Sequence, residues 1–201
     1  MSELAQGRRV AFVYAALVLL VGAVLALLPQ HMQDTVVLES STNLTTLTQH
    51  PFGVLFASAF VVSNVGGPWQ LPLLLWGYGA VERWLGAAAA VIVGVLGHVG
   101  ATLLVATVLV TGIRRGVFNL EVSRVADVGV SYGLAAVGGL LVVRVPRRYL
   151  LLYLVLVGVF LVGGLLAFRS FTALGHLTAF LIGLSLAQLV RVAAGSSARL
   201  P

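Results

Sequence analysis

The sequence predicts an all-α membrane protein that crosses the bilayer with six helices. Of its 201 residues, 60% are hydrophobic and only 9% are charged, and the hydrophobic residues stand in long blocks rather than in short periodic runs. A soluble domain of this size needs more polar surface than such a composition supplies. The bilayer is therefore the solvent in which these helices have to be considered.

A membrane-spanning helix needs roughly 20 mostly apolar residues. We expect six spans, at about 11–28, 70–80, 85–110, 128–145, 149–168 and 175–190. The first block follows Arg8-Arg9 and would also fit a cleaved signal peptide, but its length and the later spans favour a retained helix. Residues 29–69 are expected to form an external loop with one short helix, at about 52–60. We interpret residues 1–201 as a single domain.

Glu82-Arg83 is predicted to form a short turn between the second and third spans. It is interpreted as a structural turn at the inner surface rather than as part of a functional site.

The net charge of +6 comes from arginine, because the chain contains no lysine. Arginines at the ends of apolar blocks are typical of topology signals and headgroup contacts, so we expect no nucleic-acid partner. An N-terminus in the cytoplasm places eight arginines in inner segments (Arg8, Arg9, Arg83, Arg144, Arg147, Arg148, Arg191 and Arg199) and four outside (Arg114, Arg115, Arg124 and Arg169). That bias predicts this orientation. The absence of cysteine excludes disulfides and thiolate catalysis.

Two polar residues stand at the outer ends of predicted spans, where burial without a partner is costly. Ser131 lies in Asp127-Val-Gly-Val-Ser-Tyr-Gly133, and His176 follows Leu174-Gly175. Both spans run from outside to inside in the predicted orientation, which places the two residues at similar depth. Adjacent helices would then let the imidazole reach the hydroxyl.

This pattern indicates a nucleophilic serine with a histidine base. A serine hydroxyl becomes reactive when a neutral histidine accepts its proton. The first turn of a helix also offers unpartnered N–H groups and a positive dipole end, which stabilise a developing oxyanion. The alternative is that Ser131 is a small packing residue bonded to its own helix, and that His176 is structural or faces headgroups.

Four segments, in order from about residue 51 to residue 183, resemble the rhomboid family of intramembrane serine proteases. Gly129-Val-Ser131-Tyr-Gly133 resembles the family's serine motif, and the segment from His176 through Ala179 to Gly183 resembles its last helix. The segments 77–86 and 56–64 are similar to the end and the entry of the second rhomboid helix.

The resemblance implies a six-helix bundle with a cavity that opens to the extracellular side. Ser131 would attack a peptide bond in or near the transmembrane segment of a single-pass membrane protein, and His176 would act as base and then as acid. Gly133, Ala179 and Gly183 would be helix-packing positions. No cofactor is implied.

The family's second helix carries a histidine and, four residues later, an asparagine that support the oxyanion. The corresponding residues here are Gly66 or Gly67 and Gln70, so that pair is not kept. We therefore take Gln70, Asn64, Gly129 and His98 as candidates for oxyanion support.

The family usually has an aromatic residue one turn after the serine that stacks on the histidine. Leu134 and Ala135 do not supply it, whereas Tyr132 stands directly beside the serine. The tryptophan-arginine pair usual in the family's first external loop is also missing.

His98 has two interpretations. A buried neutral histidine paired with a neighbouring helix is the simpler one, and the other is that it enters the cavity and replaces the missing oxyanion donor or holds the hydrolytic water. Asp127 is predicted to be the N-cap of the helix that contains Ser131. His31 and His50 stand in loop sequence without visible partners, so we expect no metal site.

Two other classes of function remain open at this stage. A catalytically inactive rhomboid-like protein that binds client transmembrane helices would fit the missing histidine and asparagine. A small transporter or channel would need intramembrane charges along a path, and no predicted span supplies a clear set.

Overall fold

The computed structural model describes residues 7–62, 67–128, 130–168 and 170–197, and every regular element in these ranges is helical. The helices are α1 (Arg9–Ala26), α2 (Gln30–Glu39), α3 (Leu44–Gln49), α4 (Pro51–Ser58), α5 (Gly67–Leu85), α6 (Ala87–Arg114), α7 (Ser131–Leu141), α8 (Arg147–Phe168) and α9 (Phe171–Ser197). Two 3₁₀ segments, η2 (Leu120–Arg124) and η3 (Val142–Arg144), complete the chain. The all-α prediction is confirmed.

Four helices in the described ranges are long and apolar enough to cross a membrane: α1, α6, and most of α8 and of α9. The segment Ser131–Arg144, which joins α7 to η3, is apolar but shorter. α5 has 19 residues and carries Pro72, Glu82 and Arg83 within its length. α7 packs inside the bundle, where neighbouring helices surround it, whereas α5 also presents exposed apolar side chains such as Leu73 and Trp76.

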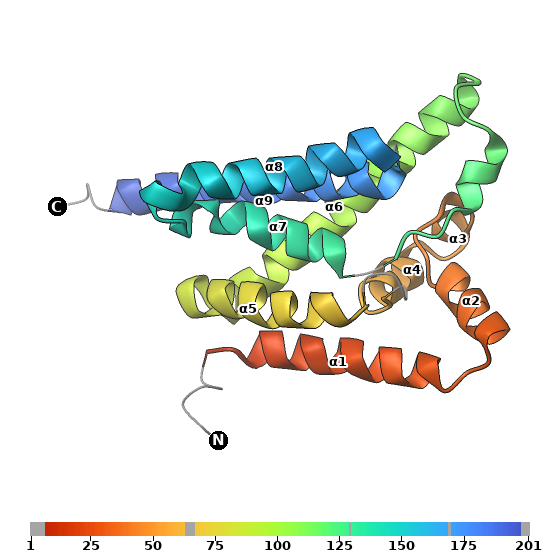
Figure 1. Ribbon diagram of the computed structural model, residues 1–201, viewed down its shortest axis with the longest axis horizontal. Coiled ribbons are helices and arrows are strands. Elements are labelled where there is room, and N and C mark those ends of the chain that lie inside the picture. Colours follow the sequence, from red (N-terminus) through yellow and green to blue (C-terminus); the bar gives the residue numbers. More distant parts are fainter. Residues whose placement is uncertain (1–6, 63–66, 129, 169, 198–201) are drawn as a thin grey trace.

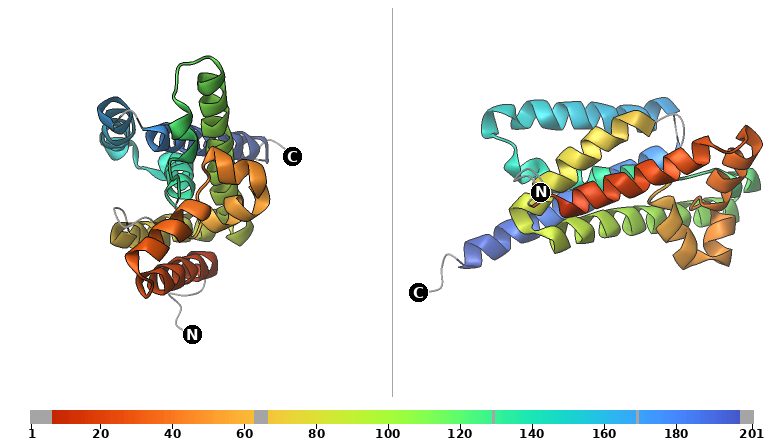
Figure 2. Two further views of the ribbon diagram at one scale, coloured as in Figure 1. Left: turned by 90° about the vertical axis from the view of Figure 1, so that its right-hand side faces the viewer. Right: turned by 90° about the horizontal axis from the view of Figure 1, so that it is seen from below.

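α7 lies at the centre of the bundle and packs against α5, α6 and α9. In Figure 1, α8 and α9 lie above α7, while α5 and then α1 lie below it. Figure 2, seen along the helices, places α1 and α8 on opposite sides of α7. Burial follows this order, because only 6% of the spanning window of α8 is buried against protein whereas α7 contributes seven buried residues. A short, small-residue helix is thus enclosed by longer apolar ones.

The contact between α7 and α9 depends on glycines. A Cβ atom on Gly183 would overlap the backbone carbonyl of Ala136, and one on Gly139 would overlap the carbonyl of Phe180. Ala179 is fully buried at the same contact. Small residues let two backbones approach this closely in a membrane, where packing rather than the hydrophobic effect holds helices together.

The connection from α1 to α5 holds three short helices where the sequence predicted one. α4 agrees with the expected short helix and begins at Pro51, a favourable first position because proline lacks an N–H. α3 forms because the Asn43 side chain accepts a hydrogen bond from the Thr46 N–H and caps the helix. The sequence predicts a loop for this stretch rich in Ser, Thr and Asn, but the same residue types are good helix caps.

The turn between α5 and α6 lies at Gly86 and not at Glu82-Arg83, which are helical. Gly86 has a φ of 90°, a conformation that residues with a side chain rarely adopt. Glu82 instead points into the bundle, is only 6% exposed, and accepts a hydrogen bond of 3.2 Å from the Ala11 N–H at the start of α1. Its carboxylate therefore stabilises the positive N-terminal end of the neighbouring helix α1.

Seven arginines of the described chain gather where α1 and α8 begin and where α5, η3 and α9 end, on the left of Figure 1. This arginine-rich end comprises Arg8, Arg9, Arg83, Arg144, Arg147, Arg148 and Arg191. α7 and α9 both begin towards the opposite end, on the side where α2, α3, α4 and η2 lie.

Candidate functional site

Ser131 is the first residue of α7, and no side chain caps this helix. The first N–H groups of α7 are therefore free of side-chain acceptors and point, with the positive end of the helix dipole, towards the space beside the serine. Ser131 is half-buried. Its hydroxyl makes no hydrogen bond to any residue in the described ranges.

Other hydroxyl side chains on the long helices are occupied by their own backbone. Thr107, Thr178 and Ser185 each donate to the carbonyl four residues earlier, at 2.7, 2.9 and 2.9 Å. Ser131 cannot do this, because the residue four positions earlier precedes the helix. Within the described residues, Ser131 therefore does not form the bond to its own helix that the alternative interpretation assumed.

His176 lies in the second turn of α9, where α9 packs against the first turn of α7. Its ring meets the ring of Tyr132 edge to face, with 5.2 Å between centroids. Gly175 makes this approach possible, since a Cβ there would overlap the Tyr132 ring. Tyr132 thus makes the histidine contact that the sequence resemblance assigns to an aromatic residue one turn later.

Ser131 and His176 therefore stand on neighbouring helices, and Tyr132, the residue beside the serine, lies against the histidine ring. No hydrogen bond joins the Ser131 hydroxyl to the imidazole within the described residues, and the ring nitrogens of His176 have no hydrogen-bond partner there either. Both polar groups are uncommitted. A hydrogen bond between the Ser131 hydroxyl and the imidazole would require at least one of these groups to move.

Asp127 does not cap α7, so that prediction was wrong. Its carboxylate accepts hydrogen bonds from the Tyr132 hydroxyl at 2.7 Å and from the Thr172 hydroxyl at 3.2 Å. The helix begins only at Ser131, too far along the chain for Asp127 to reach a capping position. Burial raises the pKa of the Asp127 carboxyl above its ordinary value, and the two hydroxyl donors partly oppose that rise.

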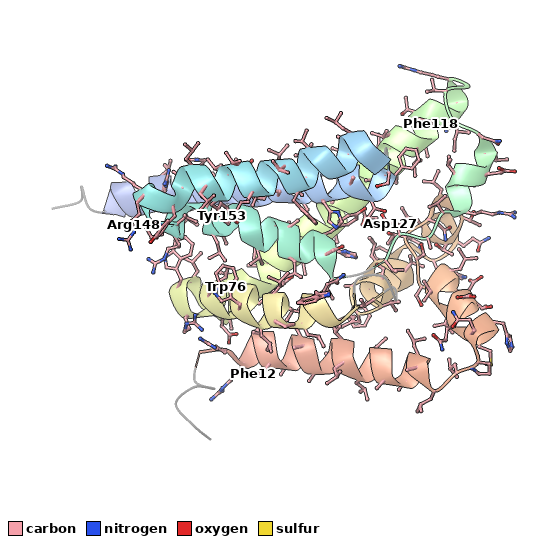
Figure 3. All side chains as sticks on the ribbon, in the orientation of Figure 1. Phe12, Trp76, Phe118, Asp127, Arg148 and Tyr153 are labelled. Atoms are coloured by element: carbon pink, nitrogen blue, oxygen red, sulfur yellow. The ribbon has the colours of Figure 1, made fainter. Side chains whose placement is uncertain are left out.

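The backbone of Asp127 is held by the connection between α2 and α3. The Asp127 N–H donates to the Ser41 hydroxyl at 2.6 Å, and its carbonyl accepts from the Thr42 N–H and hydroxyl, both at 2.9 Å. Figure 3 labels Asp127, which lies between η2 and α7, beside the short helices. This residue thereby links the α2–α3 connection to both α7 and α9.

His98 lies on α6 and is 7% exposed. Its Nε2 atom is 3.0 Å from the Ser58 hydroxyl and 3.1 Å from the Leu55 carbonyl, both on α4. Because a carbonyl can only accept, Nε2 carries the proton when that bond forms, and Nδ1 is then an acceptor. Nδ1 is buried without a partner in the described chain. The histidine thus pairs with a neighbouring helix, and its ring lies 6.3 Å from that of Tyr132.

The remaining support candidates divide into described and undescribed residues. Gln70 lies in the first turn of α5, and its side-chain oxygen is buried without a partner among the described residues. Asn64, Gly66 and Gly129 lie outside the described residues. Gly133 packs against Tyr78, whose hydroxyl would overlap a Cβ at this position.

Three groups near the site were not predicted from the sequence: Ser58, Thr172 and the pair Ser41-Thr42. Thr172 stands one turn before His176 on α9, a spacing that puts both on neighbouring parts of one helix face. For Thr172, this spacing from His176 was a signal in the sequence. Ser58 and Ser41 had no such signal, because their partners are 40 and 86 residues away. No group of three or more His, Asp or Glu side chains in the described part of the chain is arranged to hold a metal ion.

The fold and the site define the class. The chain is an integral membrane protein, a bundle of apolar helices with a serine at the start of a central helix and a histidine on the helix beside it. The family model for rhomboid-like proteins matches residues 6–196. The chain belongs to the rhomboid-like family, as the sequence motifs indicated. No curated protein and no solved structure matches it significantly.

Proposed function

We propose that this protein is an intramembrane serine protease of the rhomboid type, with Ser131 as nucleophile and His176 as general base. The observation that carries the proposal is the pair of uncommitted side chains on α7 and α9, which the Tyr132–His176 contact connects. Family membership over residues 6–196 supports the same assignment.

The proposed topology has six transmembrane helices: α1, α5, α6, α7, α8 and α9. The arginine-rich end faces the cytoplasm, because arginine accumulates on the cytoplasmic side of membrane proteins. The N-terminus is then cytoplasmic, and Ser131 and His176 lie towards the extracellular side, from which water enters the cavity.

The chemistry uses one proton that moves twice. The His176 imidazole takes the Ser131 proton as the hydroxyl oxygen attacks the scissile carbonyl, and then gives it to the leaving amine. Water attacks the acyl-enzyme with His176 again as base. N–H groups at the start of α7 stabilise the oxyanion, and the Gln70 amide is the candidate second donor.

Tyr132 orients the base in this proposal. Its hydroxyl is fixed by Asp127, so its ring forms a wall that restricts the His176 ring to a few orientations. Substrate binding then has to supply the side-chain rotation that closes the serine–histidine hydrogen bond. Apo enzymes often hold such bonds long or misaligned.

The proposed substrates are single-pass membrane proteins cleaved in or near their transmembrane segments, with no cofactor. Rhomboid-type enzymes cut near helix-breaking residues, where an unwound backbone can reach the nucleophile. Lipid is the second partner, because much of the surface of α1, α8 and α9 is apolar and exposed.

Covalent labelling by a fluorophosphonate tests the assignment. The purified protein in detergent or vesicles should label, Ser131→Ala should abolish labelling, and His176→Ala should slow it by at least a hundredfold. Ser185→Ala is the matched control, because this serine sits on α9 but is exposed and bonded to the Leu181 carbonyl. Labelling that survives in Ser131→Ala would refute the nucleophile.

The second candidate is an inactive rhomboid-like protein that binds client transmembrane helices. The missing hydrogen bond between Ser131 and His176 favours it, as does glycine at the usual histidine position. A protein that captures a single-pass client equally well in wild type and Ser131→Ala, and that never labels, would fit this function instead.

A further inference from the structure

A pocket of about 520 Å³ lies near the arginine-rich end, between α5 and α8, and is distinct from the Ser131–His176 site. Trp76 and Trp84 of α5 form one wall, and Leu152, Tyr153 and Leu156 of α8 form the other. The end of α7 and η3 close it from behind. Figure 3 labels Trp76 and Tyr153 in this region, with Arg148 nearby at the beginning of α8.

The walls are apolar and face outwards. Trp76, Leu152 and Leu156 are 62%, 57% and 60% exposed, so their surfaces meet whatever surrounds the protein. Tyr153 does not add a free polar group, because its hydroxyl donates to the Gly138 carbonyl at 2.9 Å. A hydrocarbon chain matches this lining.

Two positive charges line the pocket. Arg83 and Arg144 both line it, are exposed, and come from different elements, α5 and η3. Neither forms an ion pair within the described residues, and no acidic residue lines the pocket. The neighbouring acid, Glu82, is engaged by the Ala11 N–H.

The arginine geometry suits a phosphate. The Arg144 guanidinium stacks over the Trp84 ring, 5.4 Å from its centroid, which holds it at the pocket while its N–H donors stay available. Tryptophan and tyrosine beside arginine are typical of the headgroup level of a bilayer. The pocket thus pairs a headgroup-level cationic site with an apolar groove.

We propose that this pocket binds one anionic glycerophospholipid, with its phosphate between Arg83 and Arg144 and an acyl chain along the groove between Trp76 and α8. The pocket volume favours a lipid chain over a helix, since three turns of a helix about 10 Å wide fill roughly 1,300 Å³. The proposal needs a membrane protein with this end at headgroup level, and it is independent of any protease activity.

Tryptophan fluorescence quenched by brominated lipid tests the proposal in the intact protein. The chain has three tryptophans, and Trp69→Phe leaves the two that line the pocket. In phosphatidylcholine vesicles, acyl-brominated phosphatidylglycerol should quench Trp69→Phe with an apparent affinity at least about fivefold above that of brominated phosphatidylcholine, the factor that one arginine near a headgroup supplies.

Charge variants show whether the preference belongs to the pocket. Arg83→Gln with Arg144→Gln should remove it, whereas Arg9→Gln with Arg191→Gln, two exposed arginines at the same end that do not line the pocket, should keep it. Equal quenching by both lipids would overturn the proposal, and so would equal loss in both double variants, because that result reports general surface charge.

A second reporter guards against misfolded variants. Trp76→Phe with Trp84→Phe leaves only Trp69, which lies at the other end of α5 and should show no lipid preference. If the charge variants do not fold, the test rests on Trp69→Phe, which keeps all arginines: equal quenching by the two lipids in this variant overturns the proposal. Displacement of the quencher by an uncharged transmembrane peptide, with no preference for phosphatidylglycerol, would assign the groove to a helix instead.

Discussion

The contact between α7 and α9 yields the sharpest stability prediction. In Gly183→Ala the new Cβ would overlap the Ala136 carbonyl and approach its Cα at 2.9 Å, so the obstacle is backbone, which cannot rotate away. Overpacking of a rigid contact typically costs about 1–3 kcal/mol, and we expect at least about 2 kcal/mol here because the helices themselves have to separate. Gly139→Ala, on the facing helix, should cost a similar amount against the Phe180 carbonyl.

The matched control is Gly158→Ala on α8, where no atom lies within 4 Å of the added Cβ. Alanine is the better helix former, so this variant should range from neutral to about 1 kcal/mol more stable. Unfolding in mixed micelles of increasing SDS fraction, followed by circular dichroism, measures all three. If Gly183→Ala unfolds at the same SDS fraction as Gly158→Ala, the close approach of α7 and α9 is not real.

Three further predictions concern the polar groups around the site. Tyr132→Phe should destabilise the protein by about 1–3 kcal/mol, because it leaves the buried Asp127 carboxylate without its 2.7 Å donor, yet fluorophosphonate labelling should persist since the ring against His176 remains. The raised pKa of Asp127 means that its folded form holds the proton more tightly, so its contribution to stability is fully present below the unfolded pKa and is lost as pH rises through the folded one. SDS unfolding midpoints of wild type should therefore decrease more between about pH 4 and pH 8 than those of Asp127→Asn. His98→Ala should loosen α4 by about 1–3 kcal/mol through loss of the Ser58 contact, measured as faster proteolysis near that helix.

Each of these has a result that contradicts it. Loss of labelling in Tyr132→Phe would mean that the tyrosine hydroxyl, and not only its ring, matters to His176. Identical pH slopes in wild type and Asp127→Asn would place the titrating group elsewhere. If His98→Ala stops substrate cleavage while α4 stays protected from proteolysis, the catalytic interpretation of His98 is favoured. Unchanged turnover in His98→Ala would rule out that interpretation.

Hydrophobic blocks were sufficient to predict where most of the long helices lie. Block length reports apolar surface directly, so α1, α6, α8 and α9 were found to within a few residues at most of their ends. Helix ends placed by charge were less accurate: Glu82-Arg83 looked like a turn, but the polar pair is tolerated inside α5 because Glu82 meets the N–H of another helix. A partner 71 residues away in sequence leaves no local signal.

In the candidate site, too, some residues could be predicted from the sequence and others could not. Ser131 and His176 were singled out by position within a span, which sequence reports. The role of Asp127 was not predictable, because proximity to a helix start favoured a cap, whereas the long reach of Tyr132 and the presence of Thr172 on α9 favoured a bond across helices. Which of two possible donors an acid finds depends on tertiary packing and not on spacing.

The bond between Glu82 and the start of α1 has a consequence for how the chain is made. α1 is synthesised before residue 82, and it buries only Ala11, Ala15, Val18 and Leu25 in the finished protein. The nascent α1 must therefore wait in the lipid, with its first amides exposed at the bilayer surface, until α5 has been synthesised and inserted.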